Sequence, residues 1–147
     1  MSNLSKACKI TVVSAAATAA TTDITTSVLD MTGYEGVMFL VMLGDVTSGC
    51  VLTLTAKGNT ANSTSSPTPI TQKATAALTA GATDCDSMVL MVDVHKTPLR
   101  YAFAVLNRTT QNAVVGGIIA IQYKAHNKPT TQDASVMASA FGVGVAA

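Results

Sequence analysis

The chain has 147 residues, of which 48% are hydrophobic and only 12% are charged, and its formal net charge is +1. Its longest apolar run, Val37–Leu43, has seven residues, against the ~20 that a spanning helix needs, which excludes a transmembrane helix. The nine Lys and Arg residues are spread out, without the basic patch of nucleic-acid binders, so we expect one domain with neither a nucleic-acid nor a membrane partner.

The N-terminal segment loosely imitates a secretory signal, with Lys6 and Lys9 before a β-branched stretch and an Ala-rich end. Its apolar centre is interrupted by Thr and Ser and lacks leucines, so we expect no cleavage and folding in the cytoplasm. The low-complexity Ala/Thr segment Ala15–Thr22 predicts a loop.

Apolar residues along the chain alternate with polar ones or form short runs, which is a strand signal and not a helical one. Leu52 and Leu54, for example, alternate with Thr53 and Thr55, which predicts one buried and one solvated face. The expected strands lie at residues 9–13, 24–30, 36–43, 50–56, 68–72, 87–95, 99–107 and 113–123, with a weaker one at 74–79. Short strands separated by regular turn signals predict an all-β fold, an antiparallel β-sandwich.

Three features refine the predicted sandwich. Gly36–Leu43 and Met88–Val92 are apolar on both faces, which is typical of central strands that are covered on both sides. The segment 87–123 predicts a three-stranded antiparallel meander, with Pro98 in its first turn. The glycine pair at residues 116–117 predicts a β-bulge and not a phosphate loop, because a strand and not a helix follows it.

Two segments fall outside the predicted sandwich of residues 1–124. Lys57–Pro69 is rich in Asn, Ser, Thr and Pro and predicts a surface excursion. Residues 125–147 predict an extended C-terminal arm that is too sparsely apolar to order itself. Such an arm is either disordered or lies along a partner as a strap, and we expect it to order only on a partner. Its candidate partner-binding residues are Val136, Met137, Phe141 and Val143.

The sequence contains no pattern that predicts catalysis. His95 and His126 are the only imidazoles and have no ligand spacing around them. Asp93 shares a strand face with His95 and could orient it as a base, but no Ser or Cys motif nearby supplies a nucleophile. We therefore expect that the protein is not an enzyme.

Metal and disulfide signals are similarly weak. A calcium loop of the EF-hand type needs a closing Glu, whereas the only glutamate is Glu35. Asp84 and Asp86 leave a looser surface cation site as the alternative to a solvated turn. The cysteines are odd in number and far apart, which favours reduced thiols packed as small hydrophobes; they are Cys8, Cys50 and Cys85. We expect no cofactor.

The methionine content is high, with seven Met against three Phe and no Trp. Methionine fills irregular cores by default, and it also supplies adaptable contact surfaces. The sequence leaves both interpretations open for the methionines in or beside predicted strands, which are Met31, Met38, Met42, Met88 and Met91.

Three stretches carry a resemblance to a known family: MSNLSK at residues 1–6, DMTGYEGVMF at residues 30–39 and VDVHKTPLRY at residues 92–101. They resemble segments of the capsid cement (decoration) proteins of tailed bacteriophages, like that of the short-tailed Bordetella phage, and the similarity extends over most of the chain up to Tyr123. It implies a jelly-roll sandwich on the outer surface of a capsid whose major capsid protein has the HK97-like fold. It also implies a homo-oligomer, a dimer before a trimer, and identifies no binding residues.

The expected function is therefore that of a structural virion protein, made in the host cytoplasm, that stabilises contacts between major capsid subunits. A dimer that engages two sites gains effective concentration and needs no single tight interface. The alternative is a carbohydrate- or surface-binding β-sandwich module, in which an exposed aromatic ring stacks on a sugar. Tyr34 and Tyr123 are the first candidates for that ring, and Tyr34 is also a candidate partner-binding residue.

Overall fold

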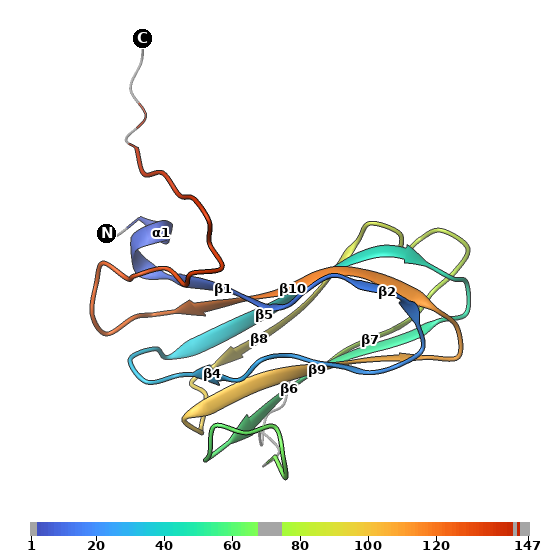
Figure 1. Cartoon of the computed structure of the whole chain (residues 1–147), viewed down its shortest axis with the longest axis horizontal. Coiled ribbons are helices and arrows are strands. Elements are labelled where there is room, and N and C mark those ends of the chain that lie inside the picture. Colours follow the sequence, from blue (N-terminus) through green and yellow to red (C-terminus); the bar gives the residue numbers. More distant parts are fainter. Residues whose placement is uncertain (1–2, 68–74, 143, 145–147) are drawn as a thin grey trace.

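The computed structural model describes residues 3–67, 75–142 and 144, and only the backbone of residues 75–77. Two antiparallel sheets pack against each other as the two layers of a sandwich (Figure 1). Sheet A contains β1 (Lys9–Ser14), β2 (Ala17–Ala20), β5 (Gly36–Val46), β8 (Val89–His95) and β10 (Ala113–Tyr123). Sheet B contains β3 (Ile24–Thr25), β4 (Leu29–Asp30), β6 (Val51–Asn59), β7 (Thr75–Thr79) and β9 (Tyr101–Thr109). A short helix, α1 (Leu4–Ala7), precedes β1. The predicted all-β antiparallel sandwich is confirmed.

Strand order determines which strands lie at the sheet edges. Sheet A runs β1-β10-β5-β8, and β2 also pairs with β10. Sheet B runs β3-β9-β6-β7, and β4 also pairs with β9. The chain changes sheet between β2 and β3, between β4 and β5, between β5 and β6, between β7 and β8, and on either side of β9. β8 therefore forms one edge of sheet A, and β1 and β2 together form the other.

The core lies between the sheets and is built from alternate residues of each strand, because successive side chains point to opposite faces. Val37, Phe39 and Val41 of β5 are fully buried, as are Leu52 and Leu54 of β6. All five belong to one buried hydrophobic cluster. Burying a side chain of this size contributes roughly 1.5–3 kcal/mol, so the core between the two sheets is the main source of stability.

Most of the predicted strands are present in the structure. The predictions at 9–13, 36–43, 50–56, 74–79, 87–95, 99–107 and 113–123 correspond to β1, β5, β6, β7, β8, β9 and β10. The strand predicted at 68–72 lies outside the described residues. β6 runs to Asn59, so the predicted excursion from Lys57 begins later than expected.

The predicted meander over 87–123 is wrong. β8 pairs with β5 in sheet A, whereas β9 pairs with β6 in sheet B. The turn around Pro98 carries the chain across the gap between the layers, and Thr97 N–H donates to Glu35 O at 3.2 Å beside it. β8 and β9, which follow each other in the sequence, therefore do not pair with each other.

Two predictions near the N-terminus also need correction. The strand expected at 24–30 is broken into β3 and β4, because Ser27 N–H leaves β9 and donates to Val13 O at 2.9 Å. The Thr26 hydroxyl accepts from Ala104 N–H instead. The loop expected at Ala15–Thr22 contains β2, which pairs with β10. Its Ala/Thr composition carries no strand signal, and Arg108 holds it in place.

Candidate docking surface

The outer face of sheet A is lined by apolar side chains from four strands. One cross-strand row joins Val12, Ile119, Leu40 and Met91, as the registers of β1, β10, β5 and β8 show. We call this surface the apolar face; its members are Ile10, Val12, Met38, Leu40, Met42, Val89, Met91, Ile119 and Ile121. Because side chains alternate along each strand, none of these residues points into the core.

Several members of the apolar face are strongly exposed. Val12 is 45% exposed, Met42 47%, Val89 53% and Met91 56%. The prediction that Gly36–Leu43 and Met88–Val92 are covered on both sides is therefore wrong, since β8 is an edge strand and its second face lies open. Contiguous exposed apolar surface is often an interaction site in other proteins, which makes this face the candidate docking surface.

The methionines divide between the two interpretations that the sequence left open. Met31 is 4% exposed and belongs to the core. Met42, Met88 and Met91 are each about half exposed or more, on or beside the apolar face. A flexible, polarisable side chain adapts to an irregular partner surface, so these three suit contact and not core filling.

A depression of about 250 Å³ lies within the apolar face, between β10, β5 and β8. It forms at a register shift between β10 and β5, where Val115 pairs with Leu43 but Gly117 pairs with Met42. The bulge predicted at residues 116–117 is thus confirmed. A side chain at Gly116 would approach Met42 Cγ to 3.3 Å, so the missing side chain keeps this depression open.

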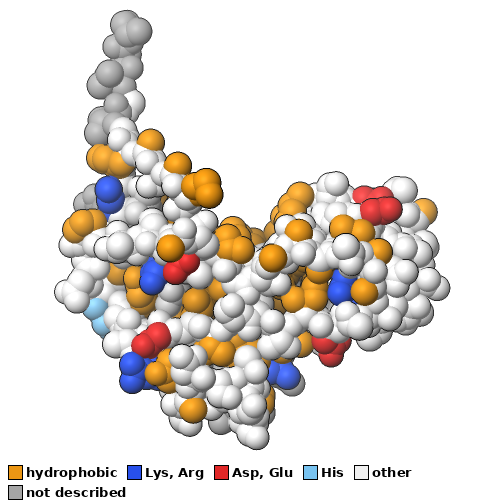
Figure 2. All heavy atoms as spheres, in the orientation of Figure 1, with side chains coloured by type: hydrophobic (Ala, Val, Ile, Leu, Met, Phe, Trp, Pro, Cys, Tyr) orange, Lys and Arg blue, Asp and Glu red, His pale blue; other side chains and the backbone are white. Residues whose placement is uncertain are grey.

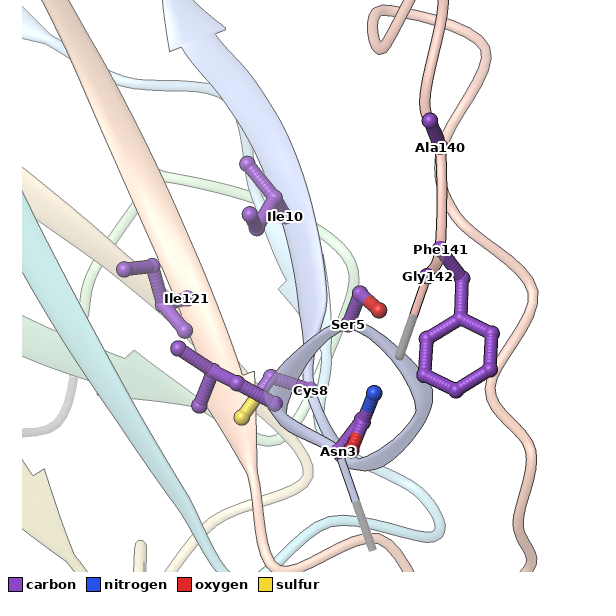
Figure 3. Close-up of a pocket in the computed structure, with 9 residues that line it drawn as sticks. Asn3, Ser5, Cys8, Ile10, Ile121, Ala140, Phe141 and Gly142 are labelled. Atoms are coloured by element: carbon purple, nitrogen blue, oxygen red, sulfur yellow. The ribbon is translucent and has the colours of Figure 1, made fainter. Parts of the chain in front are cut away.

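A second depression of about 390 Å³ lies where the sheet, α1 and the C-terminal arm meet. Figure 3 shows its lining residues: Ile10 and Ile121 from the strands, residues of α1 and its flanks, and Phe141 from the arm. Lys6 Nζ lies 5.5 Å from the centre of the Phe141 ring, a cation–π distance. The apolar face therefore continues onto the arm.

Figure 2 shows the combined shape of this surface. Hydrophobic side chains occupy the hollow between the arm and the opposite end of the sandwich, and others lie along the arm above it. In Figure 1 the arm rises from the same end of sheet A that carries α1. The surface is thus concave, with sheet A as its floor and the arm as one wall.

The first part of the arm binds the outer edge of β1. Gln132 Oε1 accepts from Ile10 N–H at 2.6 Å, and Ser135 Oγ accepts from Val12 N–H at 2.9 Å. Gln132 Nε2 also donates to Cys8 O at 2.7 Å, and Thr130 N–H donates to Lys6 O at 2.9 Å. The expectation that the whole arm orders only on a partner is therefore wrong for residues 130–135, which find their partners within the chain.

The second part of the arm carries the predicted partner-binding residues. Val136 is half-buried, whereas Met137 is 98% exposed and Phe141 53% exposed. Val143 lies outside the described residues. Tyr34 does not share this exposed position: its ring is half-buried and packs against the core, and burial raises the pKa of its hydroxyl.

A polar cluster ends the outer face of sheet A. Tyr123 Oη donates to Asp93 Oδ1 at 2.6 Å, and the Tyr123 and His95 rings stack with centroids 6.1 Å apart. Burial and the Asp93 carboxylate both raise the pKa of Tyr123. A Cβ on Gly36 would overlap the Tyr123 ring, so glycine there lets the ring lie flat across β5. Asp93 therefore accepts a hydrogen bond from Tyr123. A catalytic base at His95 would instead need Asp93 to orient the imidazole.

The remaining candidate chemistry is limited. Cys8, Cys50 and Cys85 are free and buried, and burial raises the pKa of each thiol, which keeps it protonated. Asp84 and Asp86 bind backbone N–H groups of Gly81 and Val46. Within the described part of the chain, no three His, Cys, Asp or Glu side chains gather closely enough to hold a metal ion. The described helix is too short to cross a membrane.

No family model matches this chain, and no curated protein matches it.

The apolar face was not predicted from the sequence. Its signal was present in the runs Gly36–Leu43 and Met88–Val92, whose outward positions are as apolar as their inward ones. That pattern has two causes, burial on both sides or a surface kept for a partner, and composition does not distinguish them.

Proposed function

We propose that the protein is a non-enzymatic structural component that binds the outer surface of a tailed-phage capsid and stabilises contacts between major capsid subunits. The observation that carries the proposal is the apolar face, which sits on the sheet and not in a closed ligand cavity. A broad, shallow surface suits a large protein partner better than a small substrate, because small-molecule sites enclose most of the ligand.

The composition of the surface supports binding to a neighbouring protein. The cross-strand rows through Leu40 and Met42 contain no charged side chain, and the first charge on this face is Asp93, opposite Met38. Charged residues are depleted at the centre of protein interfaces. Polar groups gather at one end, around Tyr123 and Asp93, in the manner of an interface rim. The formal net charge of +1 also lets many copies crowd one shell with little mutual repulsion.

The strand arrangement supports the jelly-roll part of the proposal. β1, β10, β5 and β8 form one layer and β3 or β4, β9, β6 and β7 the other. Successive long strands lie in opposite layers, as they do when a folded-over pair of Greek keys forms a jelly roll. This connectivity is expected of the cement proteins that the sequence resembles.

The test is co-sedimentation of purified protein with undecorated shells of an HK97-fold capsid. Met42→Glu places a charge in the centre of the apolar face and should weaken binding about 100-fold, because the carboxylate must lose its water on docking. Thr79→Glu is the matched control, since Thr79 is exposed on sheet B, and it should bind like the native protein. Equal binding by both variants would contradict docking through this face.

The carbohydrate-binding alternative has weaker support. Tyr34 packs against the core, which leaves its ring poorly placed to stack on a sugar. Tyr123 lies on the outer face but is already stacked on His95. Glycan binding that is lost in Tyr34→Ala or Tyr123→Ala would favour this alternative over capsid binding.

A further inference from the structure

The two edges of sheet A are treated differently by the chain. The outer edge of β1 is capped, because Gln132 and Ser135 of the arm accept from Ile10 N–H and Val12 N–H. β8, at the other edge, pairs with β5 alone among the described strands. An uncovered strand edge is a template for pairing with another chain, and proteins normally protect it.

The direction of each β8 backbone group follows from alternation across the sheet. The backbone N–H groups of Ile10 and Val12 point to the arm, so the backbone groups of the residue between them point to β10. The registers of β10 with β5 and of β5 with β8 extend this alternation across the sheet to β8. The bond from Leu43 N–H to Met88 O, 2.8 Å long, agrees with it. The residues whose backbone groups face the open edge are Val89, Met91, Asp93 and His95. Within the described residues these groups have no hydrogen-bond partner.

We propose that β8 pairs antiparallel with β8 of a second copy, across a two-fold axis at Val92. This register sets Met91 opposite the partner's Asp93 and Val89 opposite the partner's His95. All four outward-facing residues then exchange backbone hydrogen bonds, which is the fullest pairing that the strand allows. The two copies of sheet A become one continuous sheet, as in other strand-addition interfaces.

Neighbouring registers are less favourable. An axis at Asp93 would place the two carboxylates directly opposite each other, about 5.5 Å apart between Cα atoms. An axis at Met91 would leave His95 opposite the partner's Ser87, which lies before the strand begins. With the axis at Val92, the carboxylates are only diagonal neighbours, about 7–8 Å apart, and each keeps its hydrogen bond from Tyr123.

A second copy is the occupant because the edge is self-complementary under this two-fold. The side chains of Val89 and Met91 lie on the outer face of sheet A, and both are more than half exposed. In the dimer they come to lie in the middle of a wider apolar surface made from both copies. The interface is small, so we expect a dissociation constant on the order of micromolar. A dimer is what the resemblance implies, whereas the strand that pairs and its register go beyond that resemblance and beyond the proposed function. The pairing is a property of the isolated protein, so it can fail or hold whether or not capsids are bound.

The register is tested by a disulfide across the axis. In Val92→Cys the two introduced thiols face each other in a non-hydrogen-bonded pair, with Cα atoms about 4.5 Å apart, which a disulfide spans. Mild oxidation should give a covalent dimer. Val94→Cys is the control, because it lies opposite the partner's Leu90 and should stay monomeric. Equal cross-linking of both variants would overturn the register.

The interface itself is tested by sedimentation velocity on the native chain and two variants. Met91→Pro removes an outward N–H without removing a bond to β5, and it should weaken dimerisation about 100-fold. Met91→Ala keeps the N–H and should dimerise within a few-fold of the native chain. A native chain that stays monomeric up to about 1 mM, or a Met91→Pro variant that dimerises like the native chain, would overturn the proposal.

Discussion

Arg108 joins the two layers of the sandwich through one buried side chain. It belongs to β9 in sheet B and is 3% exposed. Its guanidinium donates to Thr18 O and Thr22 O, both at 2.9 Å, and to Ala113 O at 2.7 Å. The acceptors lie in and after β2 and at the start of β10, so the contacts hold a segment whose apolar side chains are all alanines, of which Ala17 packs against the core.

Arg108→Ala should lower the free energy of unfolding by about 1–3 kcal/mol, because it leaves the buried Ala113 carbonyl and the part-buried carbonyls of Thr18 and Thr22 without this donor. Urea denaturation measures the change. Arg100→Ala is the matched control: it removes an exposed guanidinium that pairs with Asp30 at 3.0 Å, and exposed ion pairs contribute little. Equal losses in the two variants would mean that Arg108 does not hold the layers together.

The Asp30 carboxylate has a pH-dependent role at the surface. The hydrogen bonds from Arg100, followed by those from Thr32, hold the pKa of Asp30 well below its usual range. A lowered folded pKa means that the stabilisation is present above the unfolded pKa, about 3.9, and is lost as the pH falls through the folded pKa.

The native chain should therefore be slightly more stable than Asp30→Asn at pH 7, and the difference should shrink below about pH 4. The effect is small because the pair is exposed and screened by salt. Thermal unfolding of both proteins between pH 2 and pH 7 measures it. A difference that grows as the pH falls would contradict this account.

The arm has two parts with different roles. Residues 130–135 cap the edge of β1, whereas Met137 and Phe141 project from the sandwich. Removal of residues 136–147 should leave the free energy of unfolding of the protein unchanged. It should lower the number of copies bound to each capsid and the heat resistance of the capsid. Removal of residues 130–147 should also destabilise the domain by about 1–3 kcal/mol, since two strand N–H groups lose their acceptors. Unchanged occupancy after the shorter deletion would remove the arm from the binding surface.

At the element scale, hydrophobic periodicity identified the strands well and their pairing poorly. Strands such as β6 carry a local signal, because Leu52 and Leu54 alternate with threonines. β2 carries none, since its Ala/Thr sequence is held by the distant Arg108. Which strands pair depends on where the chain crosses between layers, as at Pro98, and that crossing is decided by packing and not by local sequence.

At the scale of the whole molecule, the two edges and the two faces of sheet A differ. The arm covers the β1 edge, the β8 edge is open, and the outer face is nearly as apolar as the inner one. The sequence indicated the arm, because its sparse apolar residues after Pro129 stand out, but it did not indicate Gln132 and Ser135, the polar side chains that hold the arm on β1. It could not indicate the apolar face, because Leu40 or Met91 looks the same in a core strand as on a docking surface.

The most direct measurement is electron cryomicroscopy of undecorated HK97-fold shells mixed with the purified protein. The account predicts bound copies whose sheet A faces the shell, with Met42 and Met91 in the contact and the arm beside it. Pairs of copies joined along β8 would add support for the dimer. Copies bound through sheet B, with the apolar face toward solvent, or shells that bind no copies, would contradict the central claim.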